Sequence, residues 1–389
     1  MHVRFRQQTA ASCSRAFNCG SAGGNSGSFW KGSATLGGYA ECLYLVKTMR
    51  RLAVFMALLV ITLAGLLWAA WGFGAFAYRL PFPAPLPQLA GGLFVLIVVA
   101  AISGMWCKAW QPVSVALLAS LGLLIWWGTI HPSHNRDWIP ELARLPQVEM
   151  AGEIMTVSNL RSFRWHSETS FDERWETRAF DLTKLDAADV ALSYWAGEDI
   201  AHLIVSFVFT DGPPLALSVE VRREKGEAWS SIGGFFKSTE LAYVAADERD
   251  VIGLRTHVRG EDVRLYQLRA TKAQARDVLM AYVADINSLA KTPRWYDTLT
   301  VNCTTLVFRL VRASGAGWGF TMPLDYRLLL TGRLPEYLQS LGALRSDVPL
   351  PELARRSRIS ESARTISLDD PAFSARIREK LPDRMRAGL

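Results

Sequence analysis

The first 130 residues contain three long apolar runs without a charged residue, at 52–78, 89–107 and 113–130. Each approaches or exceeds the roughly 20 residues that a helix needs to cross the hydrocarbon core of a bilayer. Tryptophans gather near the ends of these runs, as aromatic side chains do at membrane interfaces. The pattern predicts three transmembrane helices in a region at 49–130. The alternative is one span followed by two buried core helices.

Basic residues around these runs predict their orientation. Lys47, Arg50 and Arg51 precede the first run and Lys108 lies between the second and third, whereas Arg79 stands on the other side. Cytoplasmic flanks of membrane helices carry the excess of Lys and Arg. We therefore expect the N-terminal end in the cytoplasm and the residues from 131 onward outside it.

Residues 1–48 differ from the rest because they are rich in Gly and Ser and follow no clear period. Met49, followed by two arginines and the first apolar run, has the form of the start of a membrane protein. We expect residues 1–48 to be either a disordered cytoplasmic extension or an over-extended gene start, and assign them no function.

Beyond residue 131, short β-rich runs are followed by two helical runs. Strands are predicted at 190–195, 202–209, 215–221, 240–244 and 263–267. Thr271 is expected to cap a helix at 272–290, where apolar residues recur at helical spacing, and a second helix is expected at about 303–312. These elements predict an α+β domain over 131–342.

The final residues, 343–389, are charged, contain Ser and Pro, and have few large apolar side chains. Such a composition lacks the apolar surface that folding requires. We expect a polar C-terminal tail that is mobile or loosely docked.

The net charge of +7 favours an acidic partner only if it lies on the folded domain. Residues 1–51 carry +6, residues 52–130 carry +2, and the remaining 259 residues carry −1. Nucleic-acid binding requires a clustered basic face, which this nearly neutral domain does not offer. We therefore expect no nucleic-acid partner.

Two charged stretches of the domain are further candidates for binding or catalytic sites. Arg222, Arg223 and Lys225 belong either to a solvated hairpin or to a contact with substrate headgroups. Residues 247–250 are interpreted as surface salt bridges rather than a metal or glycosidase site, because no converging histidines accompany them. The sequence predicts no cofactor and no metal.

Cys303 is the one cysteine that the expected topology places outside the cytoplasm, and the five cysteines show no paired spacing. It lies in TVNCTT at the start of the second predicted helix of the domain, where backbone N–H groups and the helix dipole lower a thiol pKa. Thr300 or Asn302 is expected to cap this helix. Cys303 is thus a candidate nucleophile; the alternative is a buried small apolar residue.

His202 is the candidate base, because it opens an apolar strand and can project from the strand end toward a helix terminus. A strand histidine facing a helix-terminal cysteine is the geometry of papain-like thiol enzymes. On the next predicted strand, Glu220 is the preferred group to orient the imidazole and Ser218 is the second choice. The alternative is a structural histidine.

Several stretches resemble the Lnb N-terminal periplasmic domain family. They are HPSHNRDWIPELARLP (131–146), YWAGEDIAHLIVSF (194–207), LSVEVRREKGEAWS (217–230), AYVAADERDVIGLR (242–255), RGEDVRLYQL (259–268) and YDTLTVNCTTLVFRL (296–310). The resemblance implies a papain-like or permuted NlpC-like thiol fold in the periplasm, anchored in the bacterial inner membrane as a multi-pass protein. Cys303 and His202 fall on the family's cysteine and histidine.

The resemblance also implies an activity. Lnb proteins move an acyl chain within bacterial lipoproteins, so the expected function is thiol acyl transfer on membrane phospholipid or lipoprotein acyl groups through Cys303 and His202. Two alternatives stay open: a cysteine peptidase or amidase acting on cell-envelope peptides, and a non-catalytic envelope binding module.

Overall fold

The computed structural model describes residues 36–228, 230–315 and 322–382, and the chain divides into two compact units, residues 1–125 and 126–389. The three predicted apolar spans are confirmed as helices long and apolar enough to cross a membrane. They are α2 (Leu36–Arg79), α3 (Leu86–Cys107) and α4 (Gln111–Thr129). Residues 36–48 already belong to α2, so this part of the expected extension is helical, while residues 1–35 lie outside the described residues.

Small residues let α2 and α3 approach each other closely. A Cβ atom on Gly72 would lie 2.2 Å from the ring of Phe94, and one on Gly91 would lie 2.8 Å from the ring of Phe73. Close approach at small residues is the usual way in which membrane helices associate. The indole of Trp68 donates to Ser120 Oγ at 2.9 Å, which links α2 to α4.

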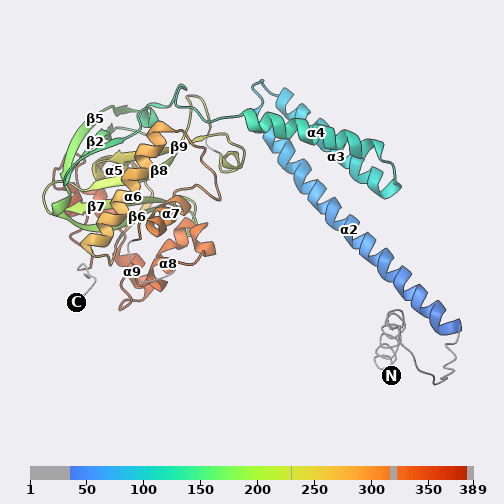
Figure 1. Ribbon diagram of the computed structural model, residues 1–389. Coiled ribbons are helices and arrows are strands. Elements are labelled where there is room, and N and C mark those ends of the chain that lie inside the picture. The colour runs from blue at the N-terminus through green and yellow to red at the C-terminus, as the bar shows by residue number, and fades with distance from the viewer. Residues whose placement is uncertain (1–35, 229, 316–321, 383–389) are drawn as a thin grey trace, which may run out of the picture. The chain divides into compact units, whose positions relative to one another are not determined.

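The second unit is built on an eight-stranded sheet with the strand order β1-β2-β9-β8-β7-β6-β10, and β5 pairs with β2 beside this path (Figure 1). All pairings are antiparallel except the single parallel contact of β2 with β9. The strands are β1 (Gln147–Ala151), β2 (Ile154–Arg161), β5 (Trp175–Asp181), β6 (Leu185–Tyr194), β7 (Ala201–Phe209), β8 (Leu215–Arg222), β9 (Glu240–Ala246) and β10 (Asp262–Gln267). The short strands β3 (Arg164–Trp165) and β4 (Phe171–Asp172) form a separate pair.

Both faces of the central strands are buried, which explains why β7 reads as a nearly continuous apolar run. One face packs against α6 (Lys272–Lys291) and α7 (Thr305–Ala313), and its core includes Leu203 and Val205 of β7. The other face carries Ile204 and packs against α5 (Glu248–Gly253), α10 (Ser360–Arg364) and α11 (Phe373–Arg376). The expected α+β organisation is confirmed at the level of three apolar helices followed by a mixed sheet domain.

The five predicted strands correspond to β6 to β10, and both predicted helices are present within two residues of their expected bounds. Thr271 caps α6 as expected, through a capping box with Gln274. Strands β1, β2 and β5 were not predicted, since residues 147–181 do not alternate strongly. The remaining short helices are η2 (Pro140–Leu142), η3 (Leu182–Lys184), η4 (Gly233–Phe235), the π-helical η5 (Leu254–Val258), η6 (Tyr326–Leu328), η7 (Thr331–Arg333), α8 (Leu334–Ser340) and α9 (Leu350–Arg356).

The C-terminal segment, residues 343–382 as described, packs onto the domain, so the expectation of a mobile or loosely docked tail was wrong. Its sparse apolar residues are spaced so that Ile359, Ala363, Phe373 and Ile377 are buried against one face of the sheet. Arg378 forms ion pairs with Glu248 and Asp189, both of which are fully buried. A few buried apolar side chains, separated by polar residues, are enough to hold the segment against the domain.

The acidic cluster at 247–250 was also misjudged, because it is buried rather than on the surface. Asp250 accepts hydrogen bonds from Nε and one terminal nitrogen of Arg161, both at 2.9 Å. Asp247 forms ion pairs with Arg178 and Arg249. These pairs join α5 to β2 and β5. Their role is therefore to hold the α5 face of the sheet together.

Candidate functional site

Three of the four predicted site residues form one hydrogen-bonded row on β7 and β8. His202 Nε2 lies 2.7 Å from Ser218 Oγ, and the Ser218 hydroxyl donates to Glu220 Oε1 at 2.7 Å. His202 Nε2 is also 3.1 Å from Glu220 Oε1. Because Ser218 gives its only proton to Glu220, it accepts from His202 Nε2, and the lone pair of a neutral imidazole then lies on Nδ1.

Arg255 extends this row, although no sequence signal singled it out. It lies in the π-helical turn η5, and its guanidinium donates to Glu220 Oε1 at 3.3 Å and to the carbonyl of Val251 at 2.9 Å. Its side chain is 5% exposed. π-Helical turns are frequent at functional sites because they redirect side chains within a helix.

The charged neighbours fix the protonation state of Glu220. Burial alone would raise its pKa, but the charge and hydrogen bond of His202, followed by Arg255 and Ser218, hold the pKa of Glu220 well below its usual range. Glu220 is therefore an anion at neutral pH and can orient and stabilise a positive imidazole.

Cys303 lies just before α7, in a turn that Asn302 organises. The Asn302 side-chain oxygen accepts from the backbone N–H groups of Thr304 and Thr305, at 2.9 and 2.8 Å. Of the two expected caps, Asn302 fills this role, while the Thr300 hydroxyl donates to Asp297. The N–H groups that we expected to stabilise a thiolate are thus already occupied.

The thiol itself is partly buried. Burial raises the pKa of Cys303, against weaker lowering contributions from the backbone N–H of Leu203 and the hydroxyls of Thr304 and Thr331. Those hydroxyls lie 3.9 and 4.0 Å from the sulfur. The expectation of a lowered thiol pKa was therefore wrong, because desolvation outweighs the helix terminus once the cap has taken its N–H groups.

Cys303 and His202 approach the same part of β7 from different sides. Cys303 packs against the core on the α6 and α7 face, and the backbone N–H of Leu203, the residue after His202, contributes a lowering of its pKa. The His202 side chain points to the other face, where it meets Ser218. Pairing of β7 with β8 begins only at Ile204, so the two strands are not bonded to each other at residues 202 and 203. In the described residues the sulfur and the imidazole do not hydrogen-bond.

An almost wholly apolar cavity of about 80 Å³ lies near Cys303, although Cys303 itself does not line it. Leu203 and Thr304, both of which influence the Cys303 thiol, form part of its wall. The remaining wall comes from β6, α6, α7 and α8 and includes Val307, Leu334 and Leu338. A space of this kind favours a hydrocarbon group over a polar one.

Two tyrosines of the same region were not predicted. Tyr282 of α6 is fully buried, and its hydroxyl has no hydrogen-bond partner among the described residues. Burial, and next the neighbouring Cys303, raise the pKa of both Tyr282 and Tyr296. In the sequence Tyr282 is indistinguishable from a core residue, because it occupies the apolar face of its helix.

The basic residues of the 222–225 stretch do not gather around this site. Arg222 is buried and donates to the carbonyls of Leu142 and Ala143, with its guanidinium over the Trp138 ring at 4.3 Å. Lys225 pairs with Asp137 on the surface. Within residues 36–228, 230–315 and 322–382, no group of three or more His, Cys, Asp or Glu side chains is arranged to hold a metal ion.

The geometry can be set beside known proteins. Residues 171–332 match the family model of the Lnb N-terminal periplasmic domain. The match covers less than half of the chain and runs from β4 to η7, so it includes His202, Ser218, Glu220 and Cys303. It confirms the resemblance that the sequence motifs indicated.

No curated protein and no solved structure matches this chain. The Lnb domain match and the three apolar helices together indicate a membrane-anchored protein with a periplasmic domain.

Proposed function

We propose that this protein is a periplasmic thiol acyltransferase, anchored in the bacterial inner membrane by several spans, that acts on the acyl groups of phospholipids or lipoproteins. Cys303 is the nucleophile and His202 the base, with Glu220 and Ser218 as positioning residues. The observation that carries the proposal is the apolar cavity that Leu203 and Thr304 line close to Cys303, because it suits an acyl chain better than a peptide. We also propose a permuted NlpC-like relationship, since histidine precedes cysteine in the chain.

In the first half-reaction, Nδ1 of His202 takes the thiol proton. The transfer passes between the ends of β7 and β8, which are not paired with each other at residues 202 and 203. The Cys303 sulfur attacks the ester carbonyl carbon, the ester C–O bond breaks, and the departing alcohol takes the proton back from His202. The product is a thioester on Cys303. This step requires a rotation of one or both side chains, which is common because catalytic hydrogen bonds often form only with substrate bound.

In the second half-reaction an amine acceptor attacks the thioester carbonyl carbon, and the C–S bond breaks. The amine proton passes by way of His202 to the sulfur, which restores the thiol. The backbone N–H of Leu203 and the buried hydroxyl of Tyr282 are the donors proposed to stabilise the oxyanion, because the first N–H groups of α7 are occupied by Asn302.

The cavity also limits the substrate. An apolar cavity of about 150 Å³ holds a benzene ring, so a space of about 80 Å³ admits only part of an acyl chain before wall side chains move. A long chain therefore has to displace residues such as Leu338. Replacing Val307 with Trp would obstruct the cavity without touching Cys303.

The decisive experiment is incubation of the full chain in detergent with an alkyne-tagged phospholipid, followed by mass spectrometry of the Cys303 peptide. The wild type is expected to carry a hydroxylamine-sensitive acyl group that Cys303→Ala lacks and that Cys107→Ala retains. His202→Ala and Val307→Trp are expected to reduce it by about a hundredfold and tenfold. Acylation that is equal in wild type and Cys303→Ala contradicts the proposal, and cleavage of envelope peptides without acyl transfer favours the amidase alternative.

A further inference from the structure

A second cavity, of about 420 Å³, lies on the other side of the turn that contacts the thiol. Thr331 of η7 touches Cys303, and the next two residues, Gly332 and Arg333, line this cavity. Gly332 fits tightly there, since a Cβ atom would lie 2.1 Å from the carbonyl oxygen of Glu198. This turn therefore separates Cys303 from the second cavity. Thr331 contacts Cys303, and the residue after it, Gly332, already lines the cavity.

The wall of the second cavity is rich in guanidinium groups. Four arginines and two glutamates, Glu198 and Glu336, line it, and further carboxylates beside the wall pair with these arginines. The arginines are Arg264, Arg333, Arg355 and Arg358. Two of them come from the C-terminal segment, whose charged composition therefore has a structural place at this wall.

Three of these arginines are partly or largely exposed, each is paired with a carboxylate, and each keeps hydrogen-bond donors available. Arg358 uses Nε and one terminal nitrogen on Asp262, both at 2.8 Å, and Arg333 uses Nε on Asp199 and one terminal nitrogen on Glu336. Arg355 pairs with Glu352 through one terminal nitrogen. In the described part of the chain, each of the three retains at least one N–H-bearing nitrogen without a protein partner. Such forks match the oxygen atoms of phosphate.

A buried hydroxyl points to the same ligand class. Tyr266 lines the cavity and is 1% exposed, and its hydroxyl lies close to Tyr194 and Arg264 but has no well-formed hydrogen bond within the described residues. A buried polar group without a partner costs free energy, so such a group marks a place where a ligand or water completes the contacts. The neighbouring Tyr194 hydroxyl, by contrast, donates to the carbonyl of Gly332 at 3.0 Å.

We propose that this cavity binds a phosphate ester, with Arg355, Arg358 and Tyr266 as the main contacts. Phosphate binding at this cavity does not depend on the proposed function, but its role does. That role is to hold the phosphate of an acyl donor while the acyl chain enters the apolar cavity near Cys303. The phosphate comes either from a phospholipid headgroup or from a soluble ester. Both sources present the same oxygen atoms to the same side chains.

The test is calorimetric titration of the full chain in non-ionic detergent with sn-glycerol 3-phosphate and, separately, with phosphatidylglycerol in micelles, with diacylglycerol micelles as the phosphate-free reference. Arg358→Gln and Arg355→Gln are expected to weaken binding about tenfold, the effect of losing one charge-assisted hydrogen bond. Tyr266→Phe is expected to weaken binding several-fold without lowering the melting temperature, because the hydroxyl has no well-formed hydrogen bond to lose.

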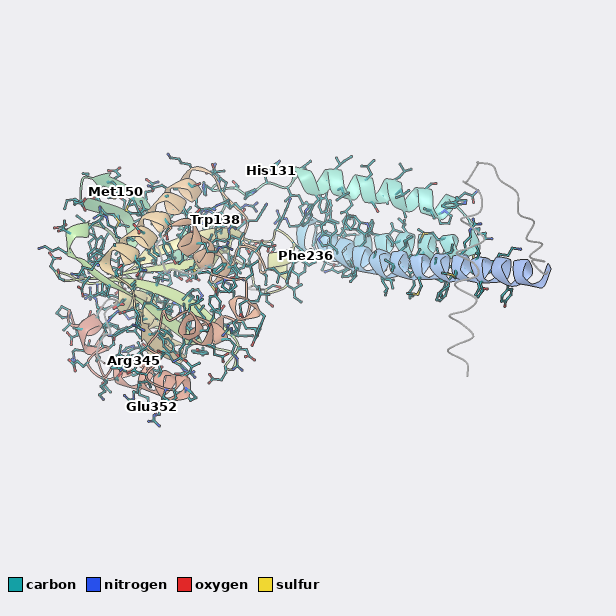
Figure 2. All side chains as sticks on the ribbon, turned by 60° about the horizontal axis from the view of Figure 1, so that its bottom comes forward. His131, Trp138, Met150, Phe236, Arg345 and Glu352 are labelled. Carbon is teal, nitrogen blue, oxygen red and sulfur yellow. The ribbon has the colours of Figure 1, made fainter. Side chains whose placement is uncertain are left out.

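Arg356→Gln is the matched control, because Arg356 shares the partner Glu352 with Arg355 but does not line the cavity. Figure 2 labels Glu352 near Arg345, on the side of the domain formed by the C-terminal segment. A response to the lipid alone identifies the headgroup as the source, and a response to both identifies a site open to soluble esters. Absence of binding to either ligand, or equal binding by wild type, Arg355→Gln and Arg358→Gln, overturns the proposal.

The titration is repeated with Cys303→Ala so that the two proposals can fail separately. Phosphate binding that persists in Cys303→Ala, together with no acyl transfer by the wild type, overturns the acyltransferase function and leaves the binding site. Acyl transfer without phosphate binding does the reverse. An equal loss of binding in Arg356→Gln indicates unspecific charge attraction and counts against the site.

Discussion

At the scale of single residues, the site combines an anionic Glu220 with a neutral thiol on Cys303, the proposed nucleophile. Glu220 is held ionised by His202 and Arg255, while burial raises the pKa of the Cys303 thiol. A thiol that stays protonated suits the proposed enzyme in an oxidising compartment, because the thiolate is the form that oxidises. Substrate that rearranges the Cys303 environment would then activate it only when needed.

The raised pKa of Cys303 predicts slow alkylation at neutral pH. The rate with iodoacetamide is expected to stay below that of a free thiol and to rise as the pH passes the ordinary thiol value of 9.0, since only the thiolate reacts. Mass spectrometry of the Cys303 peptide measures the rate, with the protein denatured in urea as control. A rate that is already maximal at neutral pH would contradict the burial argument.

Glu220→Gln tests the relay through stability. The substitution leaves Arg255 without its buried anion, so we expect a loss of about 1–3 kcal/mol at neutral pH. Because the folded pKa of Glu220 lies below the ordinary 4.5, its contribution is present above that value and is lost as the pH falls through the folded pKa. Denaturation curves across this range should show the two proteins converging in acid.

The matched control for this series is Glu224→Gln. Glu224 belongs to the same stretch but forms a partly exposed pair with Arg136. Its loss is expected to change stability by less than about 1 kcal/mol. If the difference in the free energy of unfolding between the wild type and Glu220→Gln does not change with pH, Glu220 acts by packing rather than by charge.

At the scale of elements, the sheet is stabilised from two sides by different means. Helices α6 and α7 cover one face with apolar side chains, whereas α5 and the C-terminal segment combine apolar anchors with buried ion pairs. Breaking one partner of a buried pair is far more costly than breaking a surface pair, because it leaves an uncompensated charge. The C-terminal segment should therefore be essential to the domain.

Arg378→Ala is expected to lower the free energy of unfolding by about 3–5 kcal/mol, since it leaves Glu248 and Asp189 buried without their cation. Arg376→Ala removes an exposed pair with Asp370 and is expected to cost less than about 1 kcal/mol. Thermal denaturation of the purified full chain compares the two. Equal melting temperatures would mean that the C-terminal segment contributes little to the fold.

At the scale of the whole molecule, apolar helices and an Lnb-like domain indicate a membrane-anchored protein, and the proposed acyl transfer uses a substrate of that membrane. Tethering to the membrane raises the local concentration of lipid at the site and removes the need to extract a free acyl chain into water. The near-neutral charge of the residues after 130 fits this arrangement, because it does not repel or trap anionic headgroups over the whole surface.

The orientation that the basic flanks predict can be tested with single cysteines in a cysteine-free background. Glu352→Cys is expected to react with a membrane-impermeant maleimide in cells whose outer membrane has been permeabilised. Lys47→Cys, at the expected cytoplasmic end of the first span, is expected to react only after lysis. Labelling of both in intact spheroplasts, or of Lys47→Cys alone, would contradict the proposed topology.

The sequence by itself determined the features that depend on local pattern. Charge-free runs predict spans because charges are costly in hydrocarbon, and apolar periodicity predicts β6 to β10, α6 and α7 because each segment must bury one or both faces. The capping box at Thr271 is equally local. The choice of His202 rested on its place at the start of an apolar strand, and that of Ser218 and Glu220 on their place on one face of the next strand.

Only the tertiary structure decided features that depend on distant partners. The pKa of Cys303 reflects burial beneath β7 and a cap by Asn302, and neither can be read from a helix start alone. The C-terminal segment docks because a few anchors and Arg378 meet residues more than a hundred positions earlier. The contact of Arg255 with Glu220 and the second cavity are likewise formed by segments that are distant in the sequence. Burial and charge interactions depend on which groups lie close together in the folded chain.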